Sequence, residues 1–302
     1  MRFNNRRVSW ALTLLLAVGL AGCARGTRAD VARPGASDLQ GQSFGSDRRR
    51  GTATLVFVLH GDVTADGGAA SAPAPASSPA PAASPAAADG AQPLSYHYGF
   101  AAAAAGAIPD SRAVALLRPG YTDGMGRQSP GSRGSDSGDS YTPDRIAAVA
   151  SAIERARQRY RGARTIVVGH SGGAAMAADL AGLRPDLIDG LVLASCPCML
   201  PEWRRHMAAR GAGSAFAAPS DSFDPLMTVG GINPAARIAV LVGADDALTP
   251  PKVSRAYAEA LALRGIATDY QVLPGRGHEI LDDPEVLAAT RRMAAALSGG
   301  TR

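Results

Sequence analysis

Short apolar runs and helix-forming stretches alternate along the chain after residue 50. The apolar runs are continuous and rich in β-branched residues, which is typical of parallel strands covered on both faces. They predict strands at residues 53–59, 113–117, 165–168, 190–194, 237–242 and 268–273. The stretches between them predict helices at residues 98–107, 143–160, 174–183, 251–264 and 284–297.

This alternation predicts an α/β fold with a mostly parallel, doubly wound sheet. Proline stands at the first position of three predicted helices, at Pro143, Pro251 and Pro284, where its missing N–H costs no helical hydrogen bond. Ligands of such sheets bind at the carboxyl ends of the strands. Candidate catalytic residues are therefore sought at those strand ends.

The first 22 residues depart from this pattern. They carry three arginines, no acidic residue and an apolar run at residues 10–20. That run is shorter than the roughly 20 residues that a membrane-spanning helix needs. A basic start followed by a short apolar run indicates a secretory signal peptide at residues 1–22.

The apolar run ends in the sequence LAGC at residues 20–23, which resembles the bacterial lipobox. The resemblance implies that Cys23 is lipidated and becomes the first mature residue, so that acyl chains anchor the protein to a membrane. An ordinary signal peptide with an incidental cysteine is the alternative. Because Ala24 is not the aspartate that retains such proteins in the inner membrane, we expect an envelope protein on the outer membrane, facing the periplasm.

Charge and composition argue against a nucleic-acid-binding protein and against a fibrous or disordered one. The formal net charge of +5 falls to +2 once Arg2, Arg6 and Arg7 leave with the signal peptide. So small a charge does not favour a nucleic-acid partner, and we expect none. With 302 residues, 46% of them hydrophobic and 19% charged, the chain can bury a sizeable core and is neither fibrous nor wholly disordered.

The chain divides into segments of different composition. Residues 23–50 are polar and glycine-rich, so we interpret them as the lipidated Cys23 followed by a flexible tether. Residues 51–302 form the predicted catalytic domain. Residues 69–88 are exclusively Ala, Pro and Ser, which forbids a continuous helix and predicts a disordered insertion at residues 69–92. Residues 197–235 contain one helix-like piece, at 202–209, and predict a small cap.

The strongest chemical motif is GHSGG at residues 169–173, which matches the G-x-S-x-G nucleophile elbow. A predicted strand precedes it and a predicted helix follows it, as the elbow requires. The sequence GQSFG at residues 41–45 also fits the pattern, but no strand precedes it. We therefore identify Ser171 as the candidate nucleophile and dismiss Ser43.

Around this motif the sequence resembles the α/β-hydrolase family over residues 52–297. The sequence VGADDALTP at residues 242–250 resembles the segment that carries the family's acid, three residues after Gly and four before Pro, which selects Asp246 over Asp245. The sequence GRGHE at residues 275–279 resembles the family's histidine loop. The resemblance implies a triad of Ser171 as nucleophile, Asp246 as acid and His278 as base, in the family's order along the chain.

The sequence LHGD at residues 59–62 resembles the end of a strand and the family's oxyanion loop. This implies an oxyanion hole made by the backbone N–H groups of Asp62 and Gly172, with Gly61 as the fallback for Asp62. The carboxylate of Asp62 must then point away from the oxyanion. His60 and His170 are expected to have structural roles beside the loops.

Cys196 and Cys198 flank Pro197. Cysteines this close form a strained disulfide, and the usual redox motif separates them by two residues, so we expect two partly buried thiols. The five histidines are scattered, and no glycine-rich loop has the spacing of a phosphate or dinucleotide site. We therefore expect neither a metal nor a cofactor.

Together these features predict a serine hydrolase that cleaves carboxylic esters or peptide and amide bonds of small to medium substrates through an acyl-enzyme. No large apolar lid of the kind that favours lipid droplets is evident in the sequence. Two alternatives remain open. One is a catalytically inactive binding protein of the envelope, which would need a misaligned triad; the other is a cofactor-free acyl transferase or perhydrolase that uses the same triad.

Overall fold

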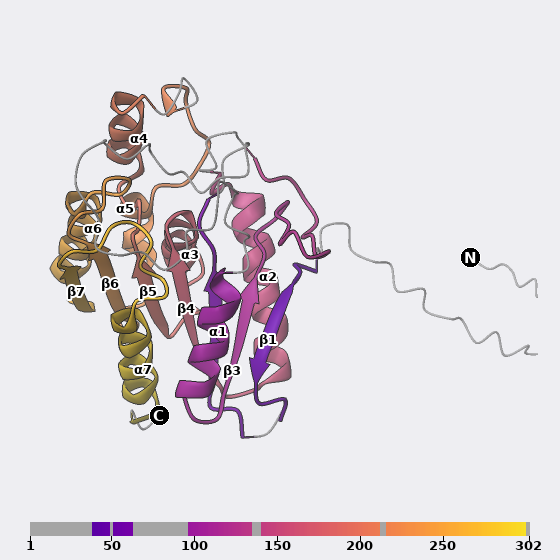
Figure 1. Cartoon of the computed structure of the whole chain (residues 1–302). Helices are drawn as coiled ribbons and strands as arrows, with labels where there is room; N and C mark the ends of the chain where they lie inside the picture. Colours follow the sequence, from indigo (N-terminus) through magenta and orange to yellow (C-terminus); the bar gives the residue numbers. More distant parts are fainter. Residues whose placement is uncertain (1–37, 49–50, 63–95, 135–139, 212–215, 300–302) are drawn as a thin grey trace, which may run out of the picture. The chain divides into compact units, whose positions relative to one another are not determined.

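Seven strands form one sheet in the computed structural model of the chain, in the order β1-β3-β2-β4-β5-β6-β7 (Figure 1). The structure describes residues 38–48, 51–62, 96–134, 140–211 and 216–299, which all belong to one unit, Gly35–Arg302. The predicted signal peptide, Cys23 and the predicted insertion at residues 69–92 lie outside the described residues. The strands are β1 (Gly41–Gly45), β2 (Thr54–Leu59), β3 (Ser111–Leu116), β4 (Arg164–His170), β5 (Gly190–Ala194), β6 (Arg237–Gly243) and β7 (Ala267–Leu273).

The sheet is parallel from β3 to β7, which confirms the predicted fold class. All six predicted strands are present, and none of their ends differs from the prediction by more than two residues. Alternate residues of β2 serve opposite faces, because Leu55 and Phe57 join one core cluster and Val56 and Val58 the other. Both faces are therefore covered by apolar side chains, as the continuous apolar runs predict.

The edge strand β1 corrects the interpretation of residues 23–50 as a tether. Residues 41–45 pair with β3 in antiparallel register, with Ser43 opposite Val114. The strand is short, begins and ends in glycine and is only partly buried, so it carries no continuous apolar signal. Ser43 lies within a strand and not at a strand-to-helix turn, in agreement with its dismissal as a nucleophile.

Five helices cover the sheet. Helices α1 (Tyr96–Ala107) and α7 (Pro284–Gly299) lie on one face, and α2 (Pro143–Arg159), α3 (Gly172–Leu183) and α6 (Pro251–Leu263) lie on the other (Figure 1). Each was predicted to within two residues at both ends. Among the described residues, no helix is both long enough and apolar enough to cross a bilayer.

Residues 197–235, the predicted cap, contain the helices α4 (Leu200–Ala209) and α5 (Pro225–Thr228) and the 3-10 turn η2 (Val229–Gly231). Two side chains of α4 hold the loop that follows β6. The indole Nε1–H of Trp203 donates to the carbonyl oxygen of Leu248 at 3.0 Å, and Nε2 of His206 lies 2.8 Å from the carbonyl oxygen of Ala247. The cap helix is thus anchored next to the predicted catalytic acid.

Candidate active site

Ser171 occupies the abrupt turn between β4 and α3. Its backbone has φ 52° and ψ −124°, a positive φ that a non-glycine residue rarely adopts and that costs about 1–3 kcal/mol. The turn is held by the Ser171 N–H, which donates to the carbonyl oxygen of Ala194 at 2.9 Å. This geometry confirms the predicted elbow and presents the serine hydroxyl at the carboxyl edge of the sheet.

The glycines around Ser171 are closely approached by neighbouring atoms, which belong to the backbone at Gly169 and Gly173 and to a side chain at Gly172. A Cβ on Gly169 would lie 2.5 Å from the Cα of Ala174. A Cβ on Gly173 would collide with the carbonyl oxygen of His60, and one on Gly172 would collide with the carboxylate of Asp62. The elbow can therefore pack against the loop after β2 only if these positions lack side chains.

The three residues of the predicted triad meet at this edge. Nε2 of His278 lies 2.9 Å from Oγ of Ser171, and Nδ1 of His278 lies 3.0 Å from Oδ2 of Asp246. Asp246 is buried in the loop after β6, whereas the neighbouring Asp245 is exposed. The spacing to the flanking Gly and Pro thus selected the carboxylate that reaches the histidine.

The carboxylate of Asp246 accepts further hydrogen bonds from its own loop. The backbone N–H groups of Leu248 and Thr249 donate to Oδ1 at 2.9 and 2.7 Å, and the hydroxyl of Thr249 donates to Oδ2 at 2.6 Å. Burial alone would raise the pKa of Asp246, but the hydrogen bonds and charge of His278 and the bonds from Thr249 hold it below its usual range. The acid is therefore ionised at neutral pH, as the orientation of the base requires. No sequence motif marked Thr249 for this contact.

His278 behaves as the partner of that carboxylate. Burial alone would lower its pKa, but the hydrogen bond and the charge of Asp246 raise the pKa above the ordinary histidine value. A histidine held this way is a stronger proton acceptor, which suits the base that removes a hydroxyl proton.

In the predicted oxyanion loop, one of the proposed backbone donors, Gly61, is already hydrogen-bonded within the protein. The N–H of Gly61 donates to the hydroxyl oxygen of Tyr96 at 2.6 Å, so the fallback donor is already engaged and we withdraw it. The assignment of Asp62 and Gly172 as donors stays a prediction. The carboxylate of Asp62 accepts from Nη2 of Arg118 at 2.6 Å and from the hydroxyl of Tyr141 at 2.7 Å.

Arg118 is a residue of this loop system for which the sequence pattern gave no role. It is buried, its Nη1 donates to the carbonyl oxygen of His60 at 3.2 Å, and its guanidinium lies 5.0 Å from the ring centre of Tyr121. Burial would lower its pKa, but the charge of Asp62 raises it. The ion pair with Asp62 thus compensates the buried charge of Arg118 beside the candidate nucleophile.

His60 is a buried, hydrogen-bonded residue, in line with the structural role expected for it. Its Nδ1 lies 2.7 Å from the carbonyl oxygen of Gly61 and its Nε2 accepts from the N–H of Arg118 at 3.0 Å. A carbonyl oxygen only accepts, so Nδ1 carries the proton. Burial lowers the pKa of His60 well below its usual value, and the ring is neutral.

The expectation of two thiols at Cys196 and Cys198 is wrong. The two residues form a disulfide and both are buried. Their Cα atoms lie 5.1 Å apart, within the range that a disulfide bridges, so a spacing of one intervening residue does not exclude the bond. Ser195, just before the disulfide, has φ 50° and donates its hydroxyl to the carbonyl oxygen of His278 at 2.8 Å.

Within the described residues, His170, His278 and Glu279 place possible metal-ligand atoms within 4.8 Å of one another. Both nitrogens of His278 are already used by Ser171 and Asp246. A cation there would have to break the triad's own hydrogen bonds. We assign no metal to this group, and the expectation that no metal or cofactor is needed stays a prediction.

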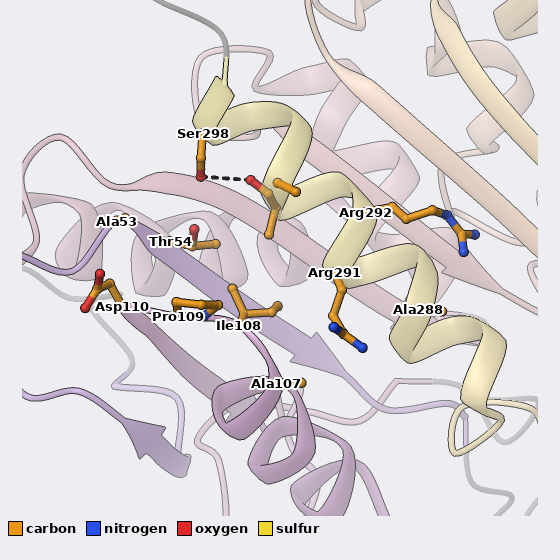
Figure 2. A pocket seen from close by; sticks show the side chains of 12 residues that line it. Ala53, Thr54, Ala107, Ile108, Pro109, Asp110, Ala288, Arg291, Arg292 and Ser298 are labelled. Carbon is orange, nitrogen blue, oxygen red and sulfur yellow. Dashed lines mark hydrogen bonds between the residues drawn. The ribbon is translucent and has the colours of Figure 1, made fainter.

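A cavity of about 720 Å³ lies between α7 and the turn from α1 to β3, as Figure 2 shows. It is lined at the start of β2 by Thr54, in the turn by Asp110 and on α7 by Arg291. Thr54 and Asp110 lie at the amino-terminal ends of β2 and β3, at the edge of the sheet opposite the triad. The cavity therefore takes no part in the candidate site.

The chain is similar to one family model and to several solved structures. A family model described as "Serine aminopeptidase, S33" matches residues 122–220. A search of curated protein sequences gives no match. Among solved structures, a monoacylglycerol lipase from Paleococcus ferrophilus has a TM-score of 0.52 at 19% identity, over 86% of this chain and 98% of that one.

Two further structures extend this comparison. An esterase from Pyrococcus furiosus has a TM-score of 0.55 at 13% identity, over 87% of this chain and 94% of that one. An acylaminoacyl peptidase from Pyrococcus horikoshii has a TM-score of 0.54 at 12% identity, over 84% of this chain and 38% of that one. The chain has the α/β-hydrolase fold, and the family match together with these neighbours supports an enzyme of that fold.

Proposed function

We propose that the protein is a serine hydrolase that cleaves carboxylic esters or amide bonds through an acyl-enzyme on Ser171. One observation carries the proposal: Nε2 of His278 lies 2.9 Å from Oγ of Ser171 while its Nδ1 lies 3.0 Å from the carboxylate of Asp246. A hydroxyl, a base and an orienting acid in this geometry are the complete nucleophilic machinery of acyl transfer to water.

The steps follow from these contacts. His278 takes the proton of Ser171 as Oγ forms a bond to the substrate carbonyl carbon, and the negative charge moves to the carbonyl oxygen. In the mechanism that we propose, the backbone N–H groups of Gly172 and Asp62 donate hydrogen bonds to that oxyanion. The intermediate collapses, the bond to the alcohol or amine breaks, and His278 gives the leaving group its proton. Water then repeats the sequence and releases the acid.

We propose substrates of small to medium size. The cap contributes one helix of ten residues, α4, which favours a site of limited depth over a broad lipid-binding surface. The similar solved structures include a monoacylglycerol lipase and an acylaminoacyl peptidase, so both ester and amide substrates belong in a first screen. The leaving group is not specified by any residue of the triad.

A fluorophosphonate probe tests the proposal directly. A purified chain of residues 24–302, without the predicted signal peptide and Cys23, is expected to be labelled at Ser171, because only an activated serine attacks the probe's phosphorus. Peptide mass spectrometry locates the adduct, and Ser171→Ala and His278→Ala should both abolish it. A well-folded protein that stays unlabelled would overturn the assignment and favour the inactive binding protein.

We also propose that the protein works at the cell envelope, held by a lipid on Cys23. The proposal rests on the lipobox-like sequence LAGC at residues 20–23 and on the firm membrane attachment that two or more acyl chains provide. Cys23→Ser is expected to move the protein from the membrane fraction to the soluble fraction on cell fractionation. Persistent membrane association of this variant would contradict the lipid anchor.

A further inference from the structure

The hydroxyl of Tyr96 connects two loops of the candidate site. Tyr96 is the first residue of α1, and its Oη accepts a hydrogen bond from the N–H of Gly61 at 2.6 Å. The same oxygen lies 3.0 Å from Nδ1 of His170, the residue that precedes the candidate nucleophile. The contacts join positions 35 and 74 residues apart in the chain.

The direction of every hydrogen bond in this connection is fixed by chemistry. Nε2 of His170 lies 3.1 Å from the carbonyl oxygen of His278. A carbonyl oxygen has no proton to give, so Nε2 carries one and Nδ1 of the neutral ring is an acceptor. The hydroxyl of Tyr96 therefore donates to Nδ1 of His170 while it accepts from Gly61.

The electrostatics keep His170 in this neutral form. Burial lowers the pKa of His170, and the nearby charge of His278 lowers it further, while Glu279 and Asp246 act in the opposite direction. Burial raises the pKa of Tyr96, so its hydroxyl keeps its proton. The ring of Tyr96 also meets that of His170 edge to face, with ring centres 5.6 Å apart.

We propose, on the basis of the function proposed above, that Tyr96 is a positioning residue. Through His170, it holds the predicted oxyanion loop in place relative to the loop that carries His278. Gly61 immediately precedes Asp62, the predicted oxyanion donor, so the bond to Gly61 fixes the peptide next to that donor. At the other end of this series of hydrogen bonds, Nε2 of His170 donates to the backbone carbonyl oxygen of His278. Tyr96 thus links the donor and the base by hydrogen bonds without touching the reacting atoms.

Tyr96→Phe removes the linking hydroxyl and keeps the ring. Because a displacement of about 1 Å in a catalytic group can cost on the order of 100-fold in rate, we expect kcat for a short-chain p-nitrophenyl ester to fall about 10- to 100-fold. KM is expected to change by less than about threefold, since the hydroxyl holds the catalytic loops and is not placed in contact with the substrate.

Tyr98→Phe is the matched control. Tyr98 lies on the same helix, and its buried hydroxyl donates to Oδ2 of Asp123 at 3.0 Å, so this variant also loses one buried hydrogen bond. The two variants should lose comparable thermal stability, whereas only Tyr96→Phe should lower kcat. Equal kcat values in both variants, or a loss confined to KM, would overturn the positioning role.

The fluorophosphonate probe separates this proposal from the function on which it rests. If wild-type protein labels at Ser171 and Tyr96→Phe labels and turns over at the wild-type rate, the positioning role fails and the hydrolase remains. If wild-type protein itself does not label, the proposed function fails. Slower labelling of Tyr96→Phe, with normal labelling of Tyr98→Phe, is the expected result.

Discussion

His278→Ala is expected to lower kcat for ester hydrolysis by about four to six orders of magnitude, because removal of the base leaves the Ser171 hydroxyl with its proton. Oγ of Ser171 and Nε2 of His278 are 2.9 Å apart, so the substitution removes the group that is placed to accept this proton. Steady-state turnover of a p-nitrophenyl ester by the purified variant measures the effect. A loss of tenfold or less would show that another group accepts the proton.

Two neighbouring aspartates provide the matched control for the acid. Asp246→Asn should lower kcat by about 10⁴-fold, because the amide favours the wrong tautomer of His278. Asp245→Asn changes an exposed carboxylate one residue away and should leave kcat within about twofold of the wild-type value. Equal effects of the two substitutions would contradict the assignment of the acid.

The second large effect is expected on stability, from a carboxyl group that catalysis does not use. Asp179 on α3 is fully buried. Its Oδ1 accepts from the hydroxyl of Thr228 at 2.9 Å, while Oδ2 finds no hydrogen-bond partner among the described residues. Burial, together with the charge of Asp224, raises the pKa of Asp179 to about 8 although the bond from Thr228 lowers it.

This shift makes the wild-type protein less stable as pH rises. Between the unfolded pKa of about 3.9 and the folded pKa, the folded protein holds a proton that the unfolded chain has lost, so the free energy of unfolding falls with pH over that window. Asp179→Asn keeps an acceptor for Thr228 and carries no titrating group. The free energy of unfolding of this variant, relative to that of wild type, should rise from pH 4 to pH 8, by at most about 5 kcal/mol.

Urea unfolding at pH 4, 6 and 8 measures this difference. The exposed Asp245→Asn serves as the control and should follow wild type at each pH. If the difference in unfolding free energy between Asp179→Asn and wild type is the same at all three pH values, Asp179 is ionised over this whole range. A variant less stable than wild type at pH 8 would mean that the buried carboxylate makes a favourable contact there.

The sequence predicts those parts of this molecule that depend on local pattern. Continuous apolar runs revealed the parallel strands, and the spacing of small residues around Ser171 revealed the elbow, where neighbouring atoms leave no room for larger side chains. The distance of Asp246 from its flanking Gly and Pro selected, over Asp245, the carboxylate that contacts His278. In each case the signal is a short local pattern, an apolar run or a fixed spacing of a few residues, even where the contact itself is made with a distant loop.

What the sequence could not predict depends on contacts between distant loops. Arg118 reaches Asp62 across 56 residues, and Tyr96 reaches His170 across 74; a single sequence carries no periodicity that marks such pairs. The edge strand β1 escaped notice because one partly buried face and two terminal glycines leave little apolar signal. The disulfide of Cys196 was missed because the spacing of cysteines constrains Cα separation only loosely.

The anchoring of α4 has a consequence for any replacement of the cap helix. The carbonyl of Ala247 held by His206 and the N–H of Leu248 that donates to Asp246 belong to one peptide unit. The next peptide repeats the arrangement, with Trp203 on the carbonyl of Leu248 and Asp246 on the N–H of Thr249. Because each peptide is planar and rigid, a graft that replaces α4 also reorients the donors to the acid. A replacement of α4 would therefore have to keep the contacts of Trp203 and His206 with this loop if the hydrogen bonds to Asp246 are to be preserved.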